Sequence, residues 1–309
     1  MAMAGSLNVY AGILVMNSMA VVLNLITMIV IIASRKLRKT HNVFIWNIAF
    51  SDFTASFFNV FTILYRHFTG QFLAGPASTV MRTSYLTGIC STVSVALHRI
   101  AIIRFDPFNT RKLFTGPRCI FVCIIFWATF LIIFFMLQYY ARRVYITISA
   151  FMPLLTFGAH CLCAVCYGLV YFTISGAARK AGLAGDTLKQ RVKQNKSVLM
   201  TFALVVGTNI LCWAPFCSRI VIGYVRPDWI PKTPSLDPTL WFKILENVAI
   251  SFQGLNGILN PVIYFTRLSA FRQLLCAACS SYKNKRRSKN GESSQQTKET
   301  SSFAISAKM

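Results

Sequence analysis

Acidic residues are scarce in this chain of 309 residues, which has 8 Asp and Glu against 32 Lys and Arg. Charged residues of both signs make up only 13% of the sequence, whereas 55% of it is hydrophobic. Ordinary soluble domains need far more polar surface, so the composition excludes them. The formal charge of +24 would suggest a nucleic-acid binder in a soluble protein, but so apolar a chain indicates a membrane protein without a nucleic-acid partner.

Seven long apolar stretches take the place of soluble domains. Each has about 20 residues or more, which is enough for a helix to cross a bilayer. Helices are expected because they satisfy their backbone polar groups without water. The sequence therefore predicts an all-α bundle of seven transmembrane helices in one domain, residues 1–279. The predicted spans are residues 9–33, 43–65, 79–103, 120–140, 144–175, 198–225 and 238–265.

The basic residues are distributed unevenly between the two ends of these stretches. The loops after the first, third and fifth stretches, together with the flanks and the tail, hold 24 of them, and the opposite side holds 8. Positive residues concentrate on the cytoplasmic side of membrane proteins. We therefore expect a multi-pass protein of the plasma membrane with an extracellular N-terminus and a cytoplasmic C-terminus. The first stretch is expected to act as an uncleaved signal anchor.

Cysteines are missing from the predicted outer loops, which argues against an extracellular disulfide framework. Of the ten cysteines, seven lie in the apolar stretches, Cys119 directly precedes the fourth stretch, and two, Cys276 and Cys279, follow the last one. The cluster HCLCAVC at residues 160–166 contains types of residue that bind metals. Small, polarizable core residues explain it better than a metal site.

A short amphipathic eighth helix is predicted at residues 267–277, where Leu268, Phe271 and Leu275 follow helical spacing. It suits a position on the inner leaflet. Cys276 and Cys279 at its end are candidates for palmitoylation, or they are unmodified thiols at the membrane interface. The tail from residue 280 to 309 is polar and predicted to be disordered.

Polar residues inside the membrane stretches carry most of the functional information. Asp52 lies in NIAFSDF in the second stretch, and His98 and Arg99 end the third in ALHRI. The sixth stretch contains CWAPF, and the seventh contains NPVIY. In this order the motifs resemble those of the rhodopsin-like (class A) G-protein-coupled receptors. The resemblance extends from residue 24 to about residue 279.

The resemblance implies a receptor that binds an extracellular ligand and activates a heterotrimeric G protein. It also implies that Asp52 and Asn260 share a polar cluster, with Asn24 nearby, and that a sodium ion occupies this cluster in many relatives. The residues that it assigns to the sodium site are Asp52, Ser84, Asn256 and Asn260. Those that it assigns to switching and G-protein coupling are His98, Arg99, Trp213, Pro215, Asn260, Pro261 and Tyr264.

Several positions depart from the family pattern. The family usually has an acidic residue before the arginine of helix three, but His98 stands there, so we expect weaker restraint on Arg99 and measurable signalling without ligand. Cys161 stands where helix five usually has a tyrosine. Met81 replaces the aspartate of the amine receptors and Gly254 replaces the lysine of the opsins, which disfavours an amine or retinal ligand.

Two arginines within the outer halves of membrane stretches need partners, because an unpaired guanidinium is costly there. Arg82 and Arg219 could bind a peptide or an anionic small molecule or lipid. They could instead pair with Glu246 or reach the lipid headgroups. The candidate ligand site contains Met81, Arg82, Phe216, Arg219 and Glu246.

Two other classes of protein remain as alternatives at this point. A small multi-pass transporter or channel would show two related halves and a charged pathway, whereas this chain has one deep acid, Asp52. A membrane enzyme would need a catalytic motif, and none of the usual triads, zinc motifs or phosphate loops occurs. Apart from the sodium ion, no cofactor is predicted.

Overall fold

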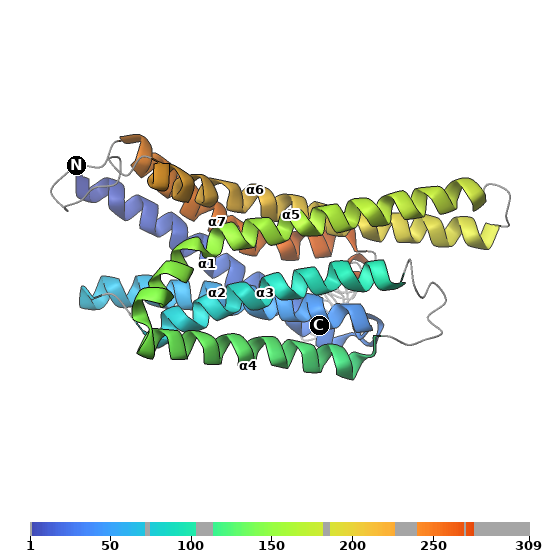
Figure 1. The fold of residues 1–309 in the computed structure, drawn as a ribbon, viewed down its shortest axis with the longest axis horizontal. Helices are drawn as coiled ribbons and strands as arrows, with labels where there is room; N and C mark the ends of the chain where they lie inside the picture. Colours follow the sequence, from blue (N-terminus) through green and yellow to red (C-terminus); the bar gives the residue numbers. More distant parts are fainter. Residues whose placement is uncertain are drawn as a thin grey trace, which may run out of the picture. The chain divides into compact units, whose positions relative to one another are not determined.

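A computed structural model describes residues 2–71, 75–102, 114–181, 186–225, 240–268 and 270–274. Every regular element in these ranges is helical (Figure 1). The chain divides into two compact units, Met1–Ile263 and Tyr264–Met309, and each is described by itself. The helices are α1 (Ala2–Ala33), η1 (Arg35–Leu37), α2 (Thr40–Thr69), α3 (Pro76–Ile100), α4 (Gly116–Tyr140), α5 (Arg142–Ala181), α6 (Asp186–Val225) and α7 (Leu240–Arg267).

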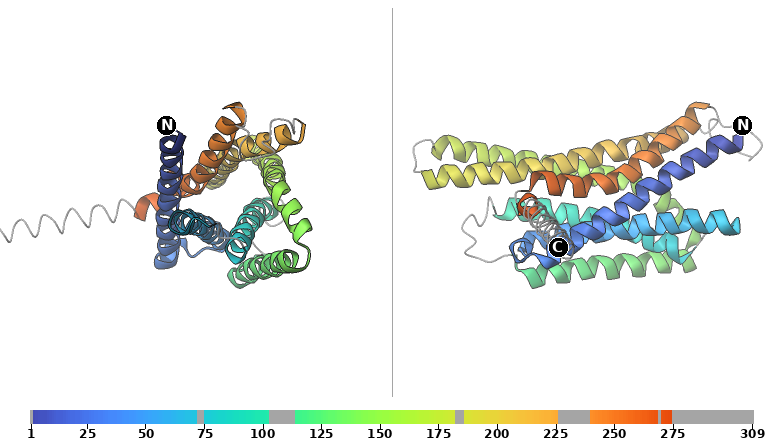
Figure 2. Two further views of the ribbon diagram at one scale, coloured as in Figure 1. Left: turned by 90° about the vertical axis from the view of Figure 1, so that its left-hand side faces the viewer. Right: turned by 180° about the vertical axis from the view of Figure 1, so that it is seen from behind.

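The predicted bundle of seven membrane-length helices is confirmed. Each of the seven apolar stretches coincides with one of the helices α1 to α7. In the first unit, α1 to α6 and the part of α7 before Tyr264 run alongside one another (Figure 2). Most helices continue beyond the predicted span because backbone hydrogen bonding does not stop where the hydrocarbon core ends.

Helix α3 differs from the other six in composition. Six helices in the described part of the chain are long and apolar enough to cross a membrane by composition alone, and α3 is not among them. Six of its ten buried residues are Ser or Thr. It packs against α2, α4 and α5. A helix surrounded by other helices presents little surface to lipid, so it can carry polar residues that hydrogen-bond within the bundle.

Helices α5 and α6 extend beyond the predicted spans. The fifth predicted span ends at residue 175 and the sixth begins at residue 198, yet α5 continues to Ala181 and α6 starts at Asp186. Both run past the end of α4 in Figure 1.

Close contacts between α1 and α7 depend on glycine. A Cβ atom built on Gly257 would lie 3.1 Å from the Cβ of Ala20 and 3.4 Å from the Oγ of Ser56. Gly254 faces Met16 in the same way, at 3.4 Å. Small residues let transmembrane helices approach closely, and here they bring α7 against α1 and α2.

In the second unit, the predicted eighth helix starts later than expected. Arg267 still belongs to α7, Leu268 is not helical, and residues 270–274 are helical. The Arg272 N–H donates to the Leu268 carbonyl at 3.1 Å, and the Phe271 ring meets the Phe265 ring edge-on at 5.3 Å. Leu275, Cys276, Cys279 and the tail lie outside the described residues, so palmitoylation and disorder remain predictions.

Candidate functional site

A small polar cavity lies where five helices of the first unit meet. Its volume is about 30 Å³. A space of roughly 10–15 Å³ already holds one water molecule, so this cavity suits one or two waters or a small ion. Its lining residues come from α2, α3, α5, α6 and α7, and they are Ile48, Asp52, Tyr85, Gly88, Ile89, Thr92, His160, Asn209, Trp213, Asn256 and Asn260.

One direct hydrogen bond crosses this cavity from α7 to α2. The side-chain amide of Asn260 donates to the Asp52 carboxylate with a distance of 2.9 Å between Nδ2 and Oδ2. The structure therefore brings together the two residues that the sequence predicted to share a polar cluster. Because a single amide cannot satisfy a carboxylate, Asp52 retains capacity for water or a cation.

Three amide oxygens around Asp52 accept no hydrogen bond within the described part of the chain. They are the buried Oδ1 atoms of Asn209, Asn256 and Asn260. Buried polar atoms in native proteins are almost always paired, with water or an ion if not with protein. Oxygen atoms are the ligands that hard cations prefer. The chemistry of the cavity therefore fits a sodium ion or ordered water.

Ser84, which the resemblance assigned to the sodium site, does not reach this cavity. Its hydroxyl donates to the Val80 carbonyl one turn earlier in α3, at 2.8 Å. Gly88, one turn further along α3, lines the cavity instead. A Cβ at Gly88 would lie 3.4 Å from the Cβ of Ser51, so α2 and α3 are close at this level.

Pro261 explains why Asn24 lies beside α7. Proline has no N–H, so Pro261 leaves the carbonyl four residues earlier, that of Gly257, without its helical donor. The side-chain amide of Asn24 in α1 donates to this carbonyl at 2.8 Å and also to the Ala20 carbonyl at 2.8 Å. Asn24 therefore replaces the hydrogen bond that proline removes.

A buried polar pair joins α5 to α6, and the sequence analysis did not predict it. The Nδ1 atom of His160 lies 2.8 Å from the Thr156 carbonyl, so this nitrogen carries the proton. Its Nε2 atom can then accept from the Asn209 side-chain amide, at 2.9 Å. His160 and Asn209 are both 3% exposed. The only sequence signal was the presence of each polar residue in an apolar stretch.

Tyr85 forms a second cluster of hydrogen bonds that the sequence analysis missed. Its hydroxyl accepts from the side-chain amides of Asn59 in α2, at 3.2 Å, and Gln253 in α7, at 2.8 Å. Its ring meets Trp213 of α6 edge-on, with 5.7 Å between centroids. Trp213, predicted as a switch residue, thus contacts α3 as well as Phe216 in its own helix.

Arg99 contacts an aromatic ring in place of a carboxylate. Its guanidinium carbon lies 5.2 Å from the centroid of the Phe202 ring in α6, which stacks on Tyr167 of α5. Among the described residues Arg99 has no ion pair, and its Nε has no hydrogen-bond partner. His98 is buried and packs its ring edge-on against Phe114, 4.8 Å away. The histidine therefore supplies no charge opposite to that of Arg99.

The two arginines of the candidate ligand site have different partners. Arg219 forms an ion pair with Glu246 at 2.9 Å, one of the two alternatives left open by the sequence. The Arg82 Nε donates to the Tyr145 hydroxyl at 3.0 Å, and its guanidinium carbon lies 5.0 Å from the centre of the same ring. Within the described ranges Arg82 has no acidic partner.

The remaining predicted residues are distributed over both units. Met81 precedes Arg82 in α3, and Pro215 and Phe216 follow Trp213 in α6. The ring of Phe216 lies 5.9 Å from the guanidinium carbon of Arg219. Tyr264 belongs to the second unit, where its ring lies 6.4 Å from that of Phe271.

Comparison with known proteins supports the same class. The profile of the family described as 7 transmembrane receptor (rhodopsin family) matches residues 23–146 and 135–264. The human substance-P receptor is 24% identical over 288 residues, which covers 82% of this chain and 66% of that receptor. Trace amine-associated receptor 1 of Mus musculus is 31% identical over 120 residues, 35% of this chain and 31% of its own length.

A similar partial match is found with octopamine receptor 1 of Lymnaea stagnalis, which is 29% identical over 114 residues, 36% of this chain and 16% of that receptor. The chain spans 66% of the length of the human substance-P receptor. Because the family profile matches most of the chain, the chain belongs to the rhodopsin family of seven-transmembrane receptors. It is a multi-pass membrane protein, and its family is one of receptors rather than enzymes or transporters.

We predict that the His160 and Asn209 side chains depend on each other energetically. The single variants His160→Phe and Asn209→Leu should each destabilise the protein by about 1–3 kcal/mol, because each leaves a buried polar group unpaired. The loss of stability in the double variant should be smaller than the sum of the losses in the two single variants. Thermal unfolding of the purified protein in detergent would measure these differences.

Thr208→Val is the matched control for this cycle, because among the described residues the Thr208 hydroxyl bonds to carbonyls of its own helix, those of Leu204 and Val205. Combined with His160→Phe, it should give an additive loss of stability. If the losses of stability from His160→Phe and Asn209→Leu were also additive, the coupling between the two side chains would be contradicted.

Proposed function

We propose that this protein is a G-protein-coupled receptor that signals by a shift between two conformations of its helix bundle. The observation that carries the proposal is the polar cavity around Asp52, to which five helices contribute. A buried carboxylate is tolerated only with donors, a proton or a cation, so a change in its surroundings changes the relative stability of helix arrangements. A ligand that binds one arrangement more tightly shifts the population towards it.

In this proposal, the cavity holds a sodium ion in the resting state. Asp52, Asn256 and Asn260 are the ligands expected from the family pattern, and the unpaired Oδ1 of Asn209 supports adding it to them. The positive charge of the ion would compensate the negative charge of the Asp52 carboxylate. Ser84 is left out of this set because it is not among the residues that line the cavity.

Sodium should stabilise the purified receptor against heat relative to choline at the same ionic strength. At about ten times its dissociation constant an ion stabilises the folded state by about 1.4 kcal/mol. The effect should disappear in Asp52→Asn and Asn256→Leu. It should persist in Ser84→Ala, which serves as the control. A sodium effect that survives Asp52→Asn would exclude the cavity as the site.

The proposed route to the G protein passes through Arg99. The resemblance places this residue at the cytoplasmic end of α3, where it would contact the G protein once α6 moves outward. In the structure the Phe202 ring links it to α6, with a cation–π contact worth roughly 0.5–2 kcal/mol. That contact gives the resting state some restraint, though less than a charged hydrogen bond to an acid would add.

We therefore expect measurable second-messenger output without ligand in cells that express the wild type. Phe202→Leu should raise this output, because it removes the ring that holds Arg99 on α6, and Arg99→Ala should abolish it. His98→Asp should lower it by supplying a carboxylate next to Arg99. His98→Asn is the matched neutral control and should leave it near the wild-type level.

Surface expression should be matched with an epitope tag at the N-terminus, which we expect to be accessible on intact cells. Staining only after permeabilisation would reverse the proposed orientation. If wild type, Phe202→Leu and His98→Asp give the same output at equal expression, restraint of Arg99 does not set the resting equilibrium.

For the extracellular ligand, we propose an anionic group that binds Arg82. Arg219 is already paired with Glu246, whereas Arg82 contacts the hydroxyl and ring of Tyr145 and has no acidic partner among the described residues. A carboxylate or phosphate could accept from the remaining guanidinium N–H groups. The names of the relatives include receptors for a peptide and for amines, and Met81 disfavours an amine here.

A screen of anionic peptides, lipids and small molecules should therefore yield an agonist whose potency depends on Arg82. Arg82→Gln should weaken that potency by about 1.5–3 kcal/mol, the range for a hydrogen bond to a charged group. Arg219→Gln is the comparison, because its charge is already compensated and its effect should be smaller. Equal loss in both variants, or none in Arg82→Gln, would refute the assignment.

A further inference from the structure

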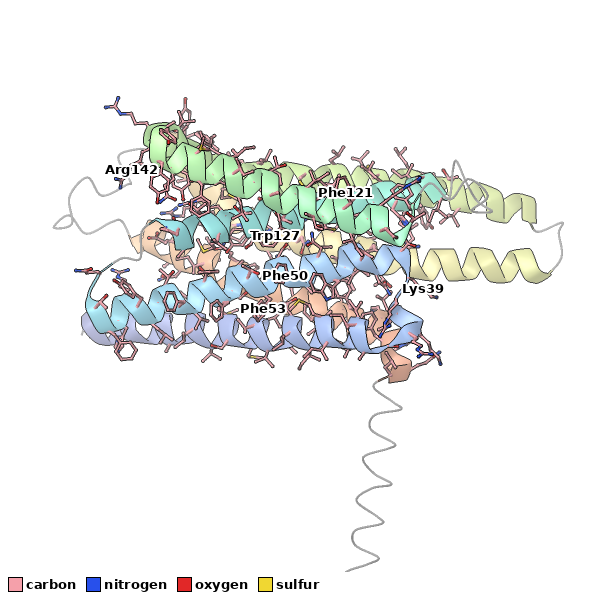
Figure 3. The ribbon with its side chains drawn as sticks, turned by 90° about the horizontal axis from the view of Figure 1, so that it is seen from below. Lys39, Phe50, Phe53, Phe121, Trp127 and Arg142 are labelled. Carbon is pink, nitrogen blue, oxygen red and sulfur yellow. The ribbon has the colours of Figure 1, made fainter. Side chains whose placement is uncertain are left out.

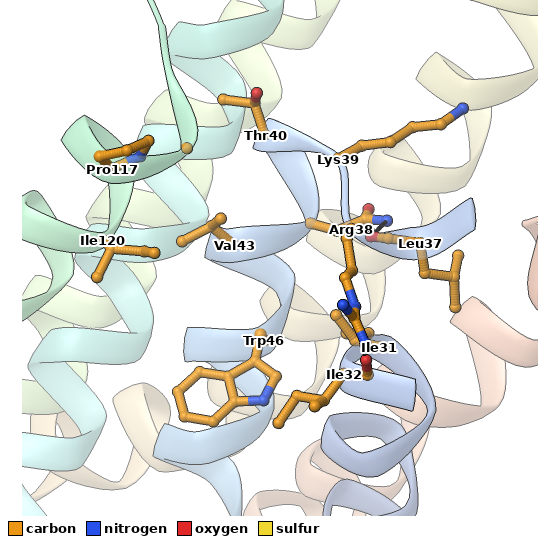
Figure 4. Close-up of a pocket in the computed structure, with 12 residues that line it drawn as sticks. Ile31, Ile32, Leu37, Arg38, Lys39, Thr40, Val43, Trp46, Pro117 and Ile120 are labelled. Carbon is orange, nitrogen blue, oxygen red and sulfur yellow. Dashed lines mark hydrogen bonds between the residues drawn. The ribbon is translucent and has the colours of Figure 1, made fainter. Parts of the chain in front are cut away.

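An apolar pocket opens at one end of the bundle, beside the short turn between α1 and α2. Its volume is about 600 Å³. Ile31 and Ile32 of α1, Trp46 of α2 and Ile120 of α4 form its walls, and Arg38 lies at its upper edge beside the two isoleucines (Figure 4). None of these residues belongs to the polar cavity or to the candidate ligand site.

The pocket continues into a second one between α2 and α4. This second pocket has a volume of about 460 Å³, and the two share Val43, Trp46 and Ile120. Phe50 and Trp127 lie further along it, with 5.2 Å between their ring centroids (Figure 3). The two pockets therefore form one continuous groove, which we name the α2–α4 groove.

The depth of the groove matches one leaflet of a bilayer. The predicted second span begins at residue 43 and the predicted fourth span at residue 120, so Arg38 and Lys39 lie just outside the predicted apolar region. From Ile120 to Leu131 the helix rises about 16 Å, at 1.5 Å per residue. Half of a hydrocarbon core about 30 Å thick is roughly 15 Å. The groove thus begins near the headgroups and ends near the bilayer midplane.

The walls of the groove are open to the lipid side. Ile120 is 50% exposed and Ile124 is 58% exposed, and both line the groove. In Figure 3, Phe121 of α4 points away from the bundle, and it is 62% exposed. In a membrane these surfaces meet acyl chains rather than water.

The rim of the groove carries positive charge, and no acidic residue lies at it among the described residues. Arg35, Lys36, Arg38 and Lys39 are all exposed, and the chain has no acidic residue before Asp52. Among the described residues none of the four forms an ion pair. The Nε of Arg38 donates to the Ile32 carbonyl at 2.8 Å, which holds the guanidinium beside the pocket (Figure 4).

The turn that presents these charges is fixed by hydrogen bonds. Leu37 is 2% exposed, and its carbonyl accepts from the Asn42 side-chain amide at 2.7 Å and from the Lys39 N–H at 2.8 Å. A basic group held in place loses less conformational entropy when it binds an anion than a freely moving one does.

We propose that the α2–α4 groove binds one anionic phospholipid of the surrounding leaflet. An acyl chain would lie along Trp46, Ile120 and Trp127, and the phosphate and second anionic group of the headgroup would meet Arg38 and Lys39. The one-leaflet depth fits a phospholipid. A zwitterionic lipid also has a phosphate, but its own cationic group offsets that charge, so the basic rim favours a headgroup with a net negative charge. This inference does not depend on the proposed signalling function.

The test compares phosphatidylserine with phosphatidylcholine, both brominated on the acyl chain, in nanodiscs that contain the full-length protein. Bromine quenches nearby tryptophans, and Trp46 and Trp127 line the groove. At equal mole fraction phosphatidylserine should quench more strongly. Its apparent affinity should exceed that of phosphatidylcholine by about fivefold for each basic contact, the equivalent of roughly 1 kcal/mol. Equal quenching by both lipids would overturn the proposal.

Two pairs of variants locate the site. Arg38→Gln with Lys39→Gln should abolish the preference for phosphatidylserine. Arg142→Gln with Arg143→Gln removes the same charge at the opposite end of the bundle, where Figure 3 places Arg142, and should retain the preference. If both pairs of variants reduce the preference for phosphatidylserine equally, general surface charge explains the binding and the groove does not.

A third variant tests the apolar lining of the α2–α4 groove. Ala128→Phe, which adds bulk inside the groove, should weaken quenching by both lipids, while thermal unfolding confirms that the protein is folded. Glycerophosphoserine, which has no acyl chains, should not compete with phosphatidylserine. Competition by this headgroup alone would show a simple anion site and contradict a lipid groove.

Discussion

A carboxylate placed in the middle of a membrane protein requires donors, a proton or a cation, and Asp52 imposes this requirement on the bundle. The amide of Asn260 meets part of it directly. Amide oxygens from α6 and α7 line the same space and accept no hydrogen bond from any described residue, so they can bind water or an ion. Because α2, α3, α5, α6 and α7 all contribute to it, the packing of five helices depends on how this one charge is compensated.

The scarcity of acidic residues also affects which groups the arginine side chains contact elsewhere in the molecule. Arg82, Arg99 and Arg219 all lie over aromatic rings, those of Tyr145, Phe202 and Phe216, at 5.0, 5.2 and 5.9 Å. Of the three, Arg219 also has a carboxylate partner in Glu246. Arg38 turns to a backbone carbonyl. In these four arginines the guanidinium group thus contacts an aromatic ring or a backbone carbonyl, and an anion could still bind to those that lack a carboxylate partner among the described residues.

The sequence predicted the helices well because length and apolarity are local properties that a membrane demands of each span. It also predicted the Asp52–Asn260 contact, but through a family pattern rather than through geometry. It could not distinguish Ser84 from Gly88, since the two lie one turn apart on the same face of α3 and the choice depends on the level along the helix at which the cavity forms. The pairing of His160 with Asn209 was equally invisible, because two polar residues 49 positions apart reveal their contact only when α5 and α6 are packed.

The hydrogen bond from Asn24 to the Gly257 carbonyl also determines where α7 can bend. A proline in an isolated helix weakens a whole turn, and the bend can spread over several residues. Here the freed carbonyl is held by the Asn24 amide of α1, and the absence of a side chain at Gly257 allows the close approach of α1 that this hydrogen bond needs. The turn before Pro261 is thereby tied to a neighbouring helix, so the cost of the proline falls on a contact between two helices and not on α7 alone.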